Sequence, residues 1–448
     1  MTAASLALSE RSVPRYTSYP TAPHFSAEIG AKEAGEWLAE LSPSAGLSLY
    51  LHVPFCPAIC TYCGCHTKAL RQDAPLTAYK ETLLREIELV SAATRARHVR
   101  SIHWGGGTPS MLGPSRFREV ARTLGEYFDL DADVEHAIEL DPRLVDEALV
   151  EALLESGVNR VSLGVQDFNP HVQKASGRDQ PYEAVERCVA LLRSGGLSAI
   201  NFDLMYGLPQ QSVDDVIRTA RLAAGLAPSR LAVFGYAHVP WFAVHQRLID
   251  SAALAGANER LAQAAAVRET LESEGFEAIG LDHFSRPHDM LAVAARAGRL
   301  HRNFQGYTTD DADALIGLGV SSIGRLPQGY LGNIGDTGNW RRAIEAERLP
   351  ISRGLAFSGE DVVRGEIIER LMCDFAVDFG AVAKAHFYRE DAFDDAKPRL
   401  APLIDEGLAE LNGRRLAITD YGRPFVRLAA AAFDAYLEAK AARHSVAV

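Results

Sequence analysis

The stretch "LSLYLHVPFCPAICTYCGCHTK", residues 47–68, places a strand-like segment directly before a loop that is rich in cysteine. Four of the six cysteines fall within ten positions there, with the spacing C-x3-C-x2-C-x-C: Cys56, Cys60, Cys63 and Cys65. The other two, Cys188 and Cys373, stand alone in helix-like stretches and are most simply core residues. What the clustered sulfur atoms bind therefore decides how the rest of the sequence is interpreted.

The spacing of this loop bears on the metal that it would hold. Zinc sites usually combine two short ligand pairs separated by a dozen or more residues, and here all four cysteines lie in one short loop. Cys63 and Cys65 have one residue between them, so in an extended chain their side chains point in opposite directions. Three workable ligands remain, Cys56, Cys60 and Cys63, and three thiolates on a four-iron cluster leave one iron open to a substrate. Zinc and a disulfide pair stay open as alternatives.

The composition is that of a globular protein with no polyanionic partner. The chain has 448 residues, 47% of them apolar, and this length favours two or three domains. Its formal net charge is −12 and it has no basic run, which disfavours a surface for DNA, RNA or an anionic membrane. Residues 1–22 lack the pattern of a signal peptide, and no apolar run approaches the ~18 residues of a membrane span. We therefore expect a cytoplasmic protein whose thiols stay reduced.

Strand-like and helix-like segments alternate from about residue 47. Six strands are expected, at residues 47–55, 101–107, 135–141, 160–165, 200–207 and 230–236, with helices between them. Six β-α units in a row indicate a parallel sheet or barrel. Asp141 with Pro142 is expected to begin a helix that ends at Gly157. Ser212 and Asp215 resemble a capping box at the start of a later helix.

The expected strands alternate between apolar and polar residues instead of being apolar throughout. Ile138 and Leu140 flank Glu139, for example, and the same alternation recurs in the other strands. One face would pack on the helices, and the other would hold a polar set: Tyr50, His52, His103, Glu139, Asp141, Ser162, Gln166, Asn201 and Asp203. Because a polar wall is costly unless it faces a ligand or water, we favour a barrel whose interior and mouth form the site. An open sheet with one wet face is the alternative.

The pattern changes past residue 280. Residues 301–324 are rich in glycine, polar and aromatic residues, which indicates a long functional loop followed by a strand. Beyond about residue 355 we expect a smaller, mainly helical unit with a helix capped by Ser358 and Asp361, a hairpin at 407–422 and a last helix at 423–443. Helices with a hairpin wing also occur in winged-helix DNA-binding modules, but the acidic charge argues against that use.

The cysteine loop resembles that of the radical S-adenosylmethionine (SAM) superfamily. Its C-x3-C-x2-C motif follows the first strand of an expected (β/α) barrel, and the aromatic Tyr62 precedes the third cysteine. Further motifs resemble one of its families, the oxygen-independent coproporphyrinogen III oxidases. They are "PRYTSYPTA" (14–22), "CTYCGCHT" (60–67), "HWGGGTPS" (103–110), "IELDPR" (138–143), "SLGVQDFN" (162–169), "FDLMYGLP" (202–209), "GLDHFSRPHD" (280–289) and "HRNFQGYTT" (301–309). They recur in family order over residues 14 to about 325, and the helical C-terminal unit fits the family too.

The resemblance implies an α/β fold, a partial (β/α)6 TIM-like barrel of the radical SAM kind with an N-terminal arm and a mainly helical C-terminal domain. We expect an arm at residues 1–45, a barrel core at 46–290, a barrel-closing extension and loop at 291–354, and a helical domain at 355–448. A haem-chaperone branch shares the barrel and the three-cysteine loop. That branch usually lacks the fourth cysteine and the arm, and this chain has Cys65 and "PRYTSYPTA".

The resemblance also assigns cofactors: one [4Fe-4S] cluster on Cys56, Cys60 and Cys63, and two molecules of SAM. Reductive cleavage of SAM on the open iron would release methionine and a 5′-deoxyadenosyl radical. The residues expected to hold the two SAM molecules are Tyr50, Tyr62, Gly106, Gly107, Thr108, Glu139, Gln166, Arg178, Asp203, Ala237 and Ile323. Taken alone, the glycines could form a phosphate loop, Glu139 a structural ion pair, and Ile323 part of the core.

The implied reaction converts two propionates of coproporphyrinogen III to vinyls, giving protoporphyrinogen IX for haem synthesis without oxygen. A reduced tetrapyrrole with four propionates needs cationic and hydrogen-bonding partners, for which Arg15, Arg302 and Gln305 are the candidates. We also expect an electron donor for the cluster, an unidentified electron acceptor, and a monomer. A chaperone that binds haem without turnover is the alternative.

Overall fold

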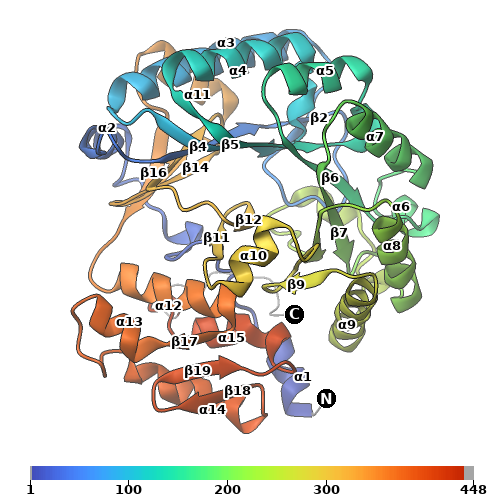
Figure 1. Cartoon of the computed structure of the whole chain (residues 1–448), viewed down its shortest axis with the longest axis vertical. Helices are drawn as coiled ribbons and strands as arrows, with labels where there is room; N and C mark the ends of the chain where they lie inside the picture. Colours follow the sequence, from blue (N-terminus) through green and yellow to red (C-terminus); the bar gives the residue numbers. More distant parts are fainter. Residues whose placement is uncertain (1–2, 438–448) are drawn as a thin grey trace.

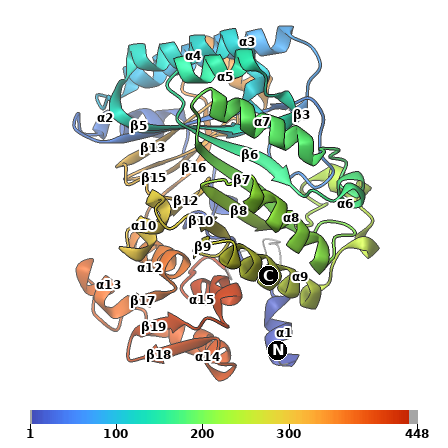
Figure 2. The same cartoon turned by 45° about the vertical axis from the view of Figure 1, so that its right-hand side comes forward.

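The computed structural model describes residues 3–437, and its main feature is a curved twelve-stranded sheet. Six parallel strands form its middle in chain order: β1 (Leu47–Val53), β4 (His98–Gly106), β5 (Asp129–Leu140), β6 (Arg160–Gln166), β7 (Ala199–Tyr206) and β8 (Arg230–Gly235). Helices cover its outer face (Figures 1 and 2): α3 (Ala74–Ala93), α4 (Gly113–Tyr127), α5 (Glu147–Glu155), α6 (Pro170–Ala175), α7 (Tyr182–Ser194), α8 (Val213–Gly225) and α9 (Ala257–Ser273). The six predicted strands and the partial barrel are confirmed.

The predicted alternation is visible in the burial of the strands. In β6 and β7 every second residue is buried, including Val161, Leu163, Phe202 and Leu204, and the residues between them are partly exposed. The buried side chains belong to one core cluster that also contains residues of the outer helices. The inner face of the sheet therefore keeps its polar side chains free of the main core.

The strands after the barrel lengthen the sheet at both edges. At one edge lie β13 (Ala314–Leu318), parallel to β1, and then β14 (Ile323–Leu326), β15 (Gly329–Asn333) and β16 (Ile351–Ala356), all antiparallel. At the other edge β10 (His283–Ser285) and β9 (Glu277–Ile279) follow β8 in antiparallel order. Among the described strands β16 and β9 are the two ends of the sheet. Residues 314–356 thus widen one edge of the sheet.

The loop predicted at residues 301–324 has structure of its own. It contains a hairpin, β11 (His301–Asn303) and β12 (Gly306–Thr308), before the predicted strand β13. The hairpin and helix α10 (Met290–Arg296) lie across the open side of the curved sheet (Figure 1). Helix α11 (Thr337–Glu345) packs on α3 at the opposite side of the molecule.

Two predicted helix starts had different outcomes. The capping box of Ser212 and Asp215 at the start of α8 is confirmed, with both reciprocal hydrogen bonds present. The helix predicted to begin at Asp141 is wrong at its start. Asp141 caps a short 3-10 turn, Pro142–Leu144, because its carboxylate accepts from the backbone and side chain of Arg143. Extended backbone at Val145 then ends that turn, and α5 begins with Asp146 as its N-cap.

The C-terminal segment forms a second core. Its elements are α12 (Asp361–Asp374), β17 (Ala376–Asp378), α13 (Phe379–Ala385), α14 (Lys397–Asp405), β18 (Ala409–Asn412), β19 (Arg415–Ile418) and α15 (Val426–Ala431). The predicted hairpin is β18–β19, and β17 pairs with β19 as a third strand. Asp361 begins α12 and its carboxylate accepts from the backbone of Ser358. The last predicted helix is shorter within the described chain, and residues 438–448 lie outside the described residues.

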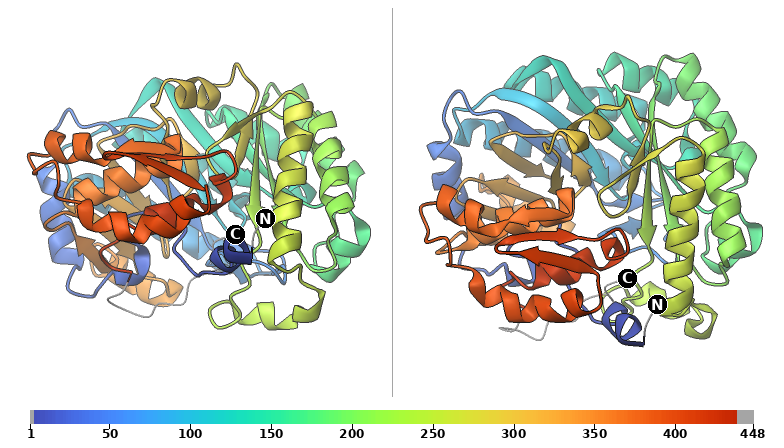
Figure 3. Two further views of the ribbon diagram at one scale, coloured as in Figure 1. Left: turned by 90° about the horizontal axis from the view of Figure 1, so that it is seen from below. Right: turned by 60° about the horizontal axis from the view of Figure 1, so that its bottom comes forward.

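The N-terminal arm contacts both cores. Helix α1 (Ala3–Ser9) and the chain after it contribute Leu8, Val13 and Tyr16 to the C-terminal core. Figure 3 shows α1 beside the C-terminal domain. Helix α2 (Ala31–Glu40) instead packs into the barrel core. The arm is therefore a strap between the two cores. The division into four segments stays a prediction.

No helix of residues 3–437 is long and apolar enough to cross a membrane.

Glu86 on α3 connects the barrel to the edge strands. Its carboxylate is fully buried and accepts three hydrogen bonds, from Gly319 N (2.7 Å), Asn333 Nδ2 (2.7 Å) and Trp340 Nε1 (3.1 Å). Burial raises the pKa of Glu86 to about 8, although these donors favour its ionised form. The folded-state pKa therefore lies above the unfolded value near 4.5, so the stability that this group contributes falls as pH rises from about 4.5 to 8.

We expect Glu86→Gln to lower the free energy of unfolding at pH 6 by about 1–3 kcal/mol. The NH2 group of the new glutamine would face one of the three buried donors that now surround the Glu86 carboxylate. Glutamine does not ionise, so the stability of the variant does not fall as position 86 titrates in wild type. The difference in the free energy of unfolding between wild type and variant should therefore narrow between pH 6 and pH 8. Urea unfolding followed by circular dichroism at both pH values measures this. Glu88→Gln, an exposed residue of the same helix, is the matched control. A difference that stays constant or widens would contradict the assignment.

Candidate active site

The cysteine loop lies at the carboxyl end of β1, pinned to the chain around it. Cys56 ends β2 (Phe55–Cys56), which pairs with β3 (Lys68–Ala69) and so brings the two ends of the loop together. The Cys56 sulfur accepts hydrogen bonds from Thr67 Oγ1 (3.3 Å) and Thr108 Oγ1 (3.4 Å). All four loop cysteines are free thiols at least partly exposed to solvent, so the proposed ligands are accessible.

A neighbouring segment supports the loop from the other side. His245 Nε2 lies 2.6 Å from the carbonyl oxygen of Cys63, and the buried Gln246 donates to the carbonyl oxygens of Tyr62 (2.9 Å) and Ala237 (3.2 Å). Both residues belong to the stretch "VPWFAVHQRLID" (239–250), which the family motifs do not include. Sequence reasoning missed them, and no pattern in the sequence links them to the cysteines.

The glycine turn after β4 is required by close packing. Gly106 has a φ of +109°, in the region that favours glycine, and a Cβ there would lie 2.6 Å from the His52 ring. A Cβ on Gly107 would lie 2.5 Å from the carbonyl oxygen of Phe55. Gly107 N and Thr108 N donate to Val53 O and Phe55 O, at 2.8 and 2.7 Å. The turn thus fastens β4 to the start of the cysteine loop.

A cavity of about 580 Å³ occupies the inside of the sheet beside the loop. Its wall includes Tyr62, Cys63 and Cys65 from the loop and, from the strands, the polar residues His103, Glu139, Ser162, Gln166, Asn201 and Asp203. Cavities of about 300–1,000 Å³ hold ligands of the size of a nucleoside. Cys63 and Cys65 of the loop therefore face the same space as much of the predicted polar wall, whereas Cys56, Cys60, Tyr50, His52 and Asp141 do not line the cavity.

The first group of predicted SAM residues surrounds Glu139. The Glu139 carboxylate lies 3.1 Å from His103 Nε2 and accepts from Gly106 N at 3.3 Å. Its side chain keeps 37% of its surface exposed, so the ion pair with His103 leaves it open to the cavity. The Tyr50 hydroxyl lies 3.1 Å from His52 Nδ1, and its ring stacks on His103 with centroids 6.0 Å apart. Tyr50, Gly106, Gly107 and Thr108 thus lie behind Glu139 and the cysteine loop instead of lining the cavity.

The second predicted group is centred on Asp203. Its carboxylate accepts from Ser162 Oγ (2.9 Å) and Asn201 Nδ2 (2.9 Å). Burial, together with the negative charge of Glu139, raises the pKa of Asp203 to about 6. Gln166 lines the same cavity and has a φ of +69°, a strained conformation that is found more often at functional sites than elsewhere.

Arg178 contacts the cysteine loop. It donates to Gly164 O (2.6 Å) and to the Cys60 sulfur (3.5 Å), and it lies 3.7 Å from the Asp141 carboxylate. Its Nε is buried without a partner. Ile323 begins β14 and lies beside Gly317, the residue paired with Tyr50. Two strands, β13 and β1, separate it from β4 in the cavity wall, so Ile323 does not line the cavity.

The substrate candidates lie where the cavity continues toward the C-terminal domain. Gln305 and Arg15 line the cavity, and Arg15 Nη2 donates to Gly235 O at 2.9 Å. Arg302 lies 3.8 Å from Asp282 in an adjoining cavity, which Arg15 also lines. Arg230 and His283 complete the wall of the barrel cavity and were missed as site residues. His283 is part of the quoted motif at 280–289, whereas only the fold brings Arg230 to this wall.

The residues present fit the implied groups. Three thiols in one loop, Cys56, Cys60 and Cys63, can hold an iron–sulfur cluster, and Cys63 also lines the cavity. Arg178, whose buried Nε has no partner, contacts the Cys60 sulfur, and Asn201 in the cavity wall has an unpartnered Oδ1. The cavity volume and its mixed donors and acceptors suit SAM. No three His, Cys, Asp or Glu side chains of residues 3–437 converge as ligands of one metal ion would.

Comparison with known proteins supports one family. Residues 50–223 match the model of the radical SAM superfamily, and residues 357–425 match that of the HemN C-terminal domain. The oxygen-independent coproporphyrinogen III oxidase of Bradyrhizobium diazoefficiens is 47% identical over 99% of this chain and 100% of its own length. The Escherichia coli oxidase of the same name is 38% identical over 96% and 94% of the two chains.

A solved structure agrees with these sequence matches. That of coproporphyrinogen III oxidase (HemN) from Escherichia coli, described as a radical SAM enzyme, superposes with a TM-score of 0.90 at 36% identity. It covers 95% of this chain and the whole of the other. The likeness extends over the barrel, the arm and the C-terminal domain together, so this chain belongs to the oxygen-independent coproporphyrinogen III oxidase family of radical SAM enzymes.

Proposed function

We propose that this enzyme converts coproporphyrinogen III to protoporphyrinogen IX in the cytoplasm, by oxidative decarboxylation of two propionates without oxygen. The observation that carries the proposal is the meeting of the cysteine loop with the polar inner wall in one cavity of about 580 Å³. A haem chaperone of the same superfamily is the weaker candidate, because the named relatives that cover nearly the whole chain are oxidases.

Cys56, Cys60 and Cys63 would hold one [4Fe-4S] cluster. When bound there, the cluster and SAM supply the radical that removes a hydrogen atom from the propionate, after which CO2 and one electron leave and the vinyl group forms. Thr67 and Thr108 donate to the Cys56 sulfur, and Arg178 donates to that of Cys60. The two threonine bonds favour the Cys56 thiolate, although burial outweighs them and raises the pKa of this thiol. The electron donor, the electron acceptor and the monomeric state stay predictions.

Two molecules of SAM would be held by two acidic positions. SAM combines a cationic sulfonium and an ammonium group with one carboxylate, so its recognition needs acids and a basic group. Glu139, with Tyr50 and the turn at Gly106, Gly107 and Thr108, would hold the SAM nearest the cluster. Asp203, with Gln166, Arg178 and the backbone at Tyr62 and Ala237, would hold the second. Ile323 would pack on a SAM adenine. Arg178 is the group that would pair with a SAM carboxylate.

The decisive experiment is anaerobic turnover. Protein reconstituted with iron and sulfide, then incubated with coproporphyrinogen III, SAM, a reductant and cell extract, should release CO2 and form protoporphyrinogen IX. Cys56→Ser should abolish both products because the cluster loses a ligand. A wild-type protein that carries a cluster and binds haem but releases no CO2 would favour the chaperone instead.

The number of protein ligands is tested separately by iron content. Cys56→Ser, Cys60→Ser and Cys63→Ser should each lose the visible absorbance of the cluster. Cys65→Ser is the matched control in the same loop, and it should keep about four irons per chain because only three thiolates are required. Loss of iron from Cys65→Ser would show that the proposed ligand set is wrong.

The two SAM sites predict a stoichiometry. Equilibrium dialysis of the reconstituted wild type should give two SAM molecules per chain. Asp203→Asn should bind one SAM per chain at SAM concentrations that saturate the site at Glu139. The amide removes a negative charge, and its NH2 group faces the donors of Ser162 and Asn201. Asp214→Asn, an exposed acid on α8, should behave as wild type. One SAM per wild-type chain would overturn the second site.

A further inference from the structure

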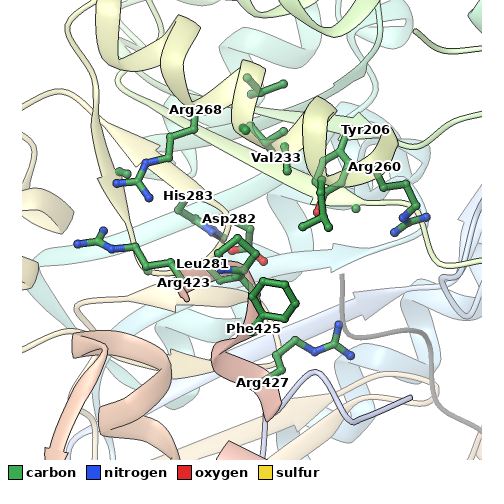
Figure 4. Close-up of a pocket in the computed structure, with 18 of the residues that line it drawn as sticks. Tyr206, Val233, Arg260, Arg268, Leu281, Asp282, His283, Arg423, Phe425 and Arg427 are labelled. Atoms are coloured by element: carbon green, nitrogen blue, oxygen red, sulfur yellow. Dashed lines mark hydrogen bonds and ion pairs between the residues drawn. The ribbon is translucent and has the colours of Figure 1, made fainter. Parts of the chain in front are cut away.

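A second cavity of about 390 Å³ adjoins the barrel cavity at its C-terminal side. It lies between α9, the sheet edge at β8–β10, and residues 420–427 of the C-terminal domain, with Arg15 of the arm in its wall. Figure 4 shows Arg260 and Arg268 reaching it from one side and Phe425 and Arg427 from the other. Arg15, Gly235, Tyr236 and His283 line both cavities, so the two spaces are neighbours.

The charge of this second cavity is strongly positive. Six arginines line it, and the two acids in its wall are Asp282 and Asp420. Arg268 pairs with Glu272 and Arg423 with Asp420, which leaves Arg15, Arg260 and Arg302 facing Asp282. Burial opposes ionisation of Asp282, but Arg302, His283 and Arg15 outweigh it and lower its pKa to about 2. Asp282 is therefore ionised, and its one negative charge does not balance the guanidinium groups around it.

Two of these arginines, Arg302 and Arg260, have donors without a hydrogen-bond partner. Arg302 is nearly buried, with 5% of its side chain exposed, and its Nε and Nη1 lack hydrogen-bond partners although Asp282 is 3.8 Å away. Arg260 uses Nη1 on Tyr236 O at 2.8 Å and leaves its buried Nε unpartnered. Within residues 3–437, no carboxylate lies within ion-pairing distance of Arg15 or Arg260. Burying such charges is costly unless an anion joins them.

The wall also has an apolar part, and no sulfur atom lines it. Val233, Leu261, Leu281, Phe284 and Phe425 line it, whereas Cys63 and Cys65 line only the barrel cavity. A ligand that enters both cavities would thus place one part beside the cysteine loop and another beside the arginines. A carboxylate held by the arginines is kept away from the loop, where the chemistry takes place.

We propose that Arg15, Arg260 and Arg302 form a subsite for a propionate of the tetrapyrrole that is not being decarboxylated. This inference rests on the proposed function and adds to it the position and orientation of the substrate. Guanidinium groups pair with carboxylates through two parallel hydrogen bonds, which would use the spare donors of Arg260 and Arg302. The apolar wall packs against the pyrrole ring that bears this propionate.

The test uses the reconstituted enzyme with two stable probes, coproporphyrin III and its tetramethyl ester, followed by fluorescence. Arg260→Gln should bind coproporphyrin III at least about tenfold more weakly than wild type, because a buried charge pair is lost. Its affinity for the ester should equal that of wild type. In turnover, the KM for coproporphyrinogen III should rise by a similar factor, with kcat changed by less than about twofold.

Matched variants separate the subsite from general damage. Arg221 is an exposed arginine on the neighbouring helix α8 and lines neither cavity, so Arg221→Gln should bind both probes as wild type does. Arg15→Gln tests the subsite from the arm, should Arg260→Gln fail to fold. It should show the same selective loss of the acid over the ester.

Three results would overturn the subsite. Arg260→Gln and Arg15→Gln could bind coproporphyrin III as wild type does, could lose acid and ester affinity by the same factor, or could weaken the binding of SAM alone. The last result would assign the arginines to the SAM carboxylate. If wild type shows the predicted selectivity but releases no CO2 with coproporphyrinogen III and SAM, the subsite is supported and the proposed function fails.

Discussion

The inner face of the curved sheet is polar, and the rest of the architecture depends on keeping that face supplied with partners. Glu139, Ser162, Asn201 and Asp203 point into a space that the main core does not fill. Polar groups in such a space need hydrogen bonds from each other, from water or from a ligand. Asp203 takes its bonds from Ser162 and Asn201, while the Asn201 Oδ1 atom is left without one. A wall whose polar atoms are only partly hydrogen-bonded to one another is suited to binding a small molecule.

The open edge of the sheet explains why the arm and the C-terminal domain are needed. A twelve-stranded sheet whose ends do not meet cannot enclose its own cavity. Arg427 of the C-terminal domain donates to the carbonyl oxygens of Val13 and Pro14, and Arg15 donates to Gly235 at the end of β8. The arm therefore fastens the second core to the barrel at the place where the two cavities adjoin. The same contacts cover the cavities and bring Arg15 into their walls.

Local patterns gave the strands, the polar wall and the cysteine loop, because each depends on neighbours close in the sequence. The spacing of Cys56, Cys60 and Cys63 and the alternation around Glu139 could be read directly. The role of Arg178 came only from resemblance, since nothing local places a loop arginine 3.5 Å from the Cys60 sulfur. The pairing of β13 with β1 and the approach of Arg260 to Arg15 join segments more than 200 residues apart. Such contacts are set by the packing of the whole chain.

The two adjoining cavities differ in charge in a way that matches the two kinds of molecule they would receive. In the barrel cavity Arg160 and Arg230 are paired with Glu135 and Asp289. That leaves the acids Glu139, Asp203 and Asp310 and the thiols, with Arg15 where the two cavities adjoin. That environment favours the cationic sulfonium and ammonium groups of SAM. The neighbouring cavity has the opposite sign and favours propionates. If the arginines hold one propionate of a tetrapyrrole, only another of its side chains can extend into the barrel cavity and approach the cysteine loop. The charges of the two cavities would thus fix the orientation of the substrate before any bond is broken.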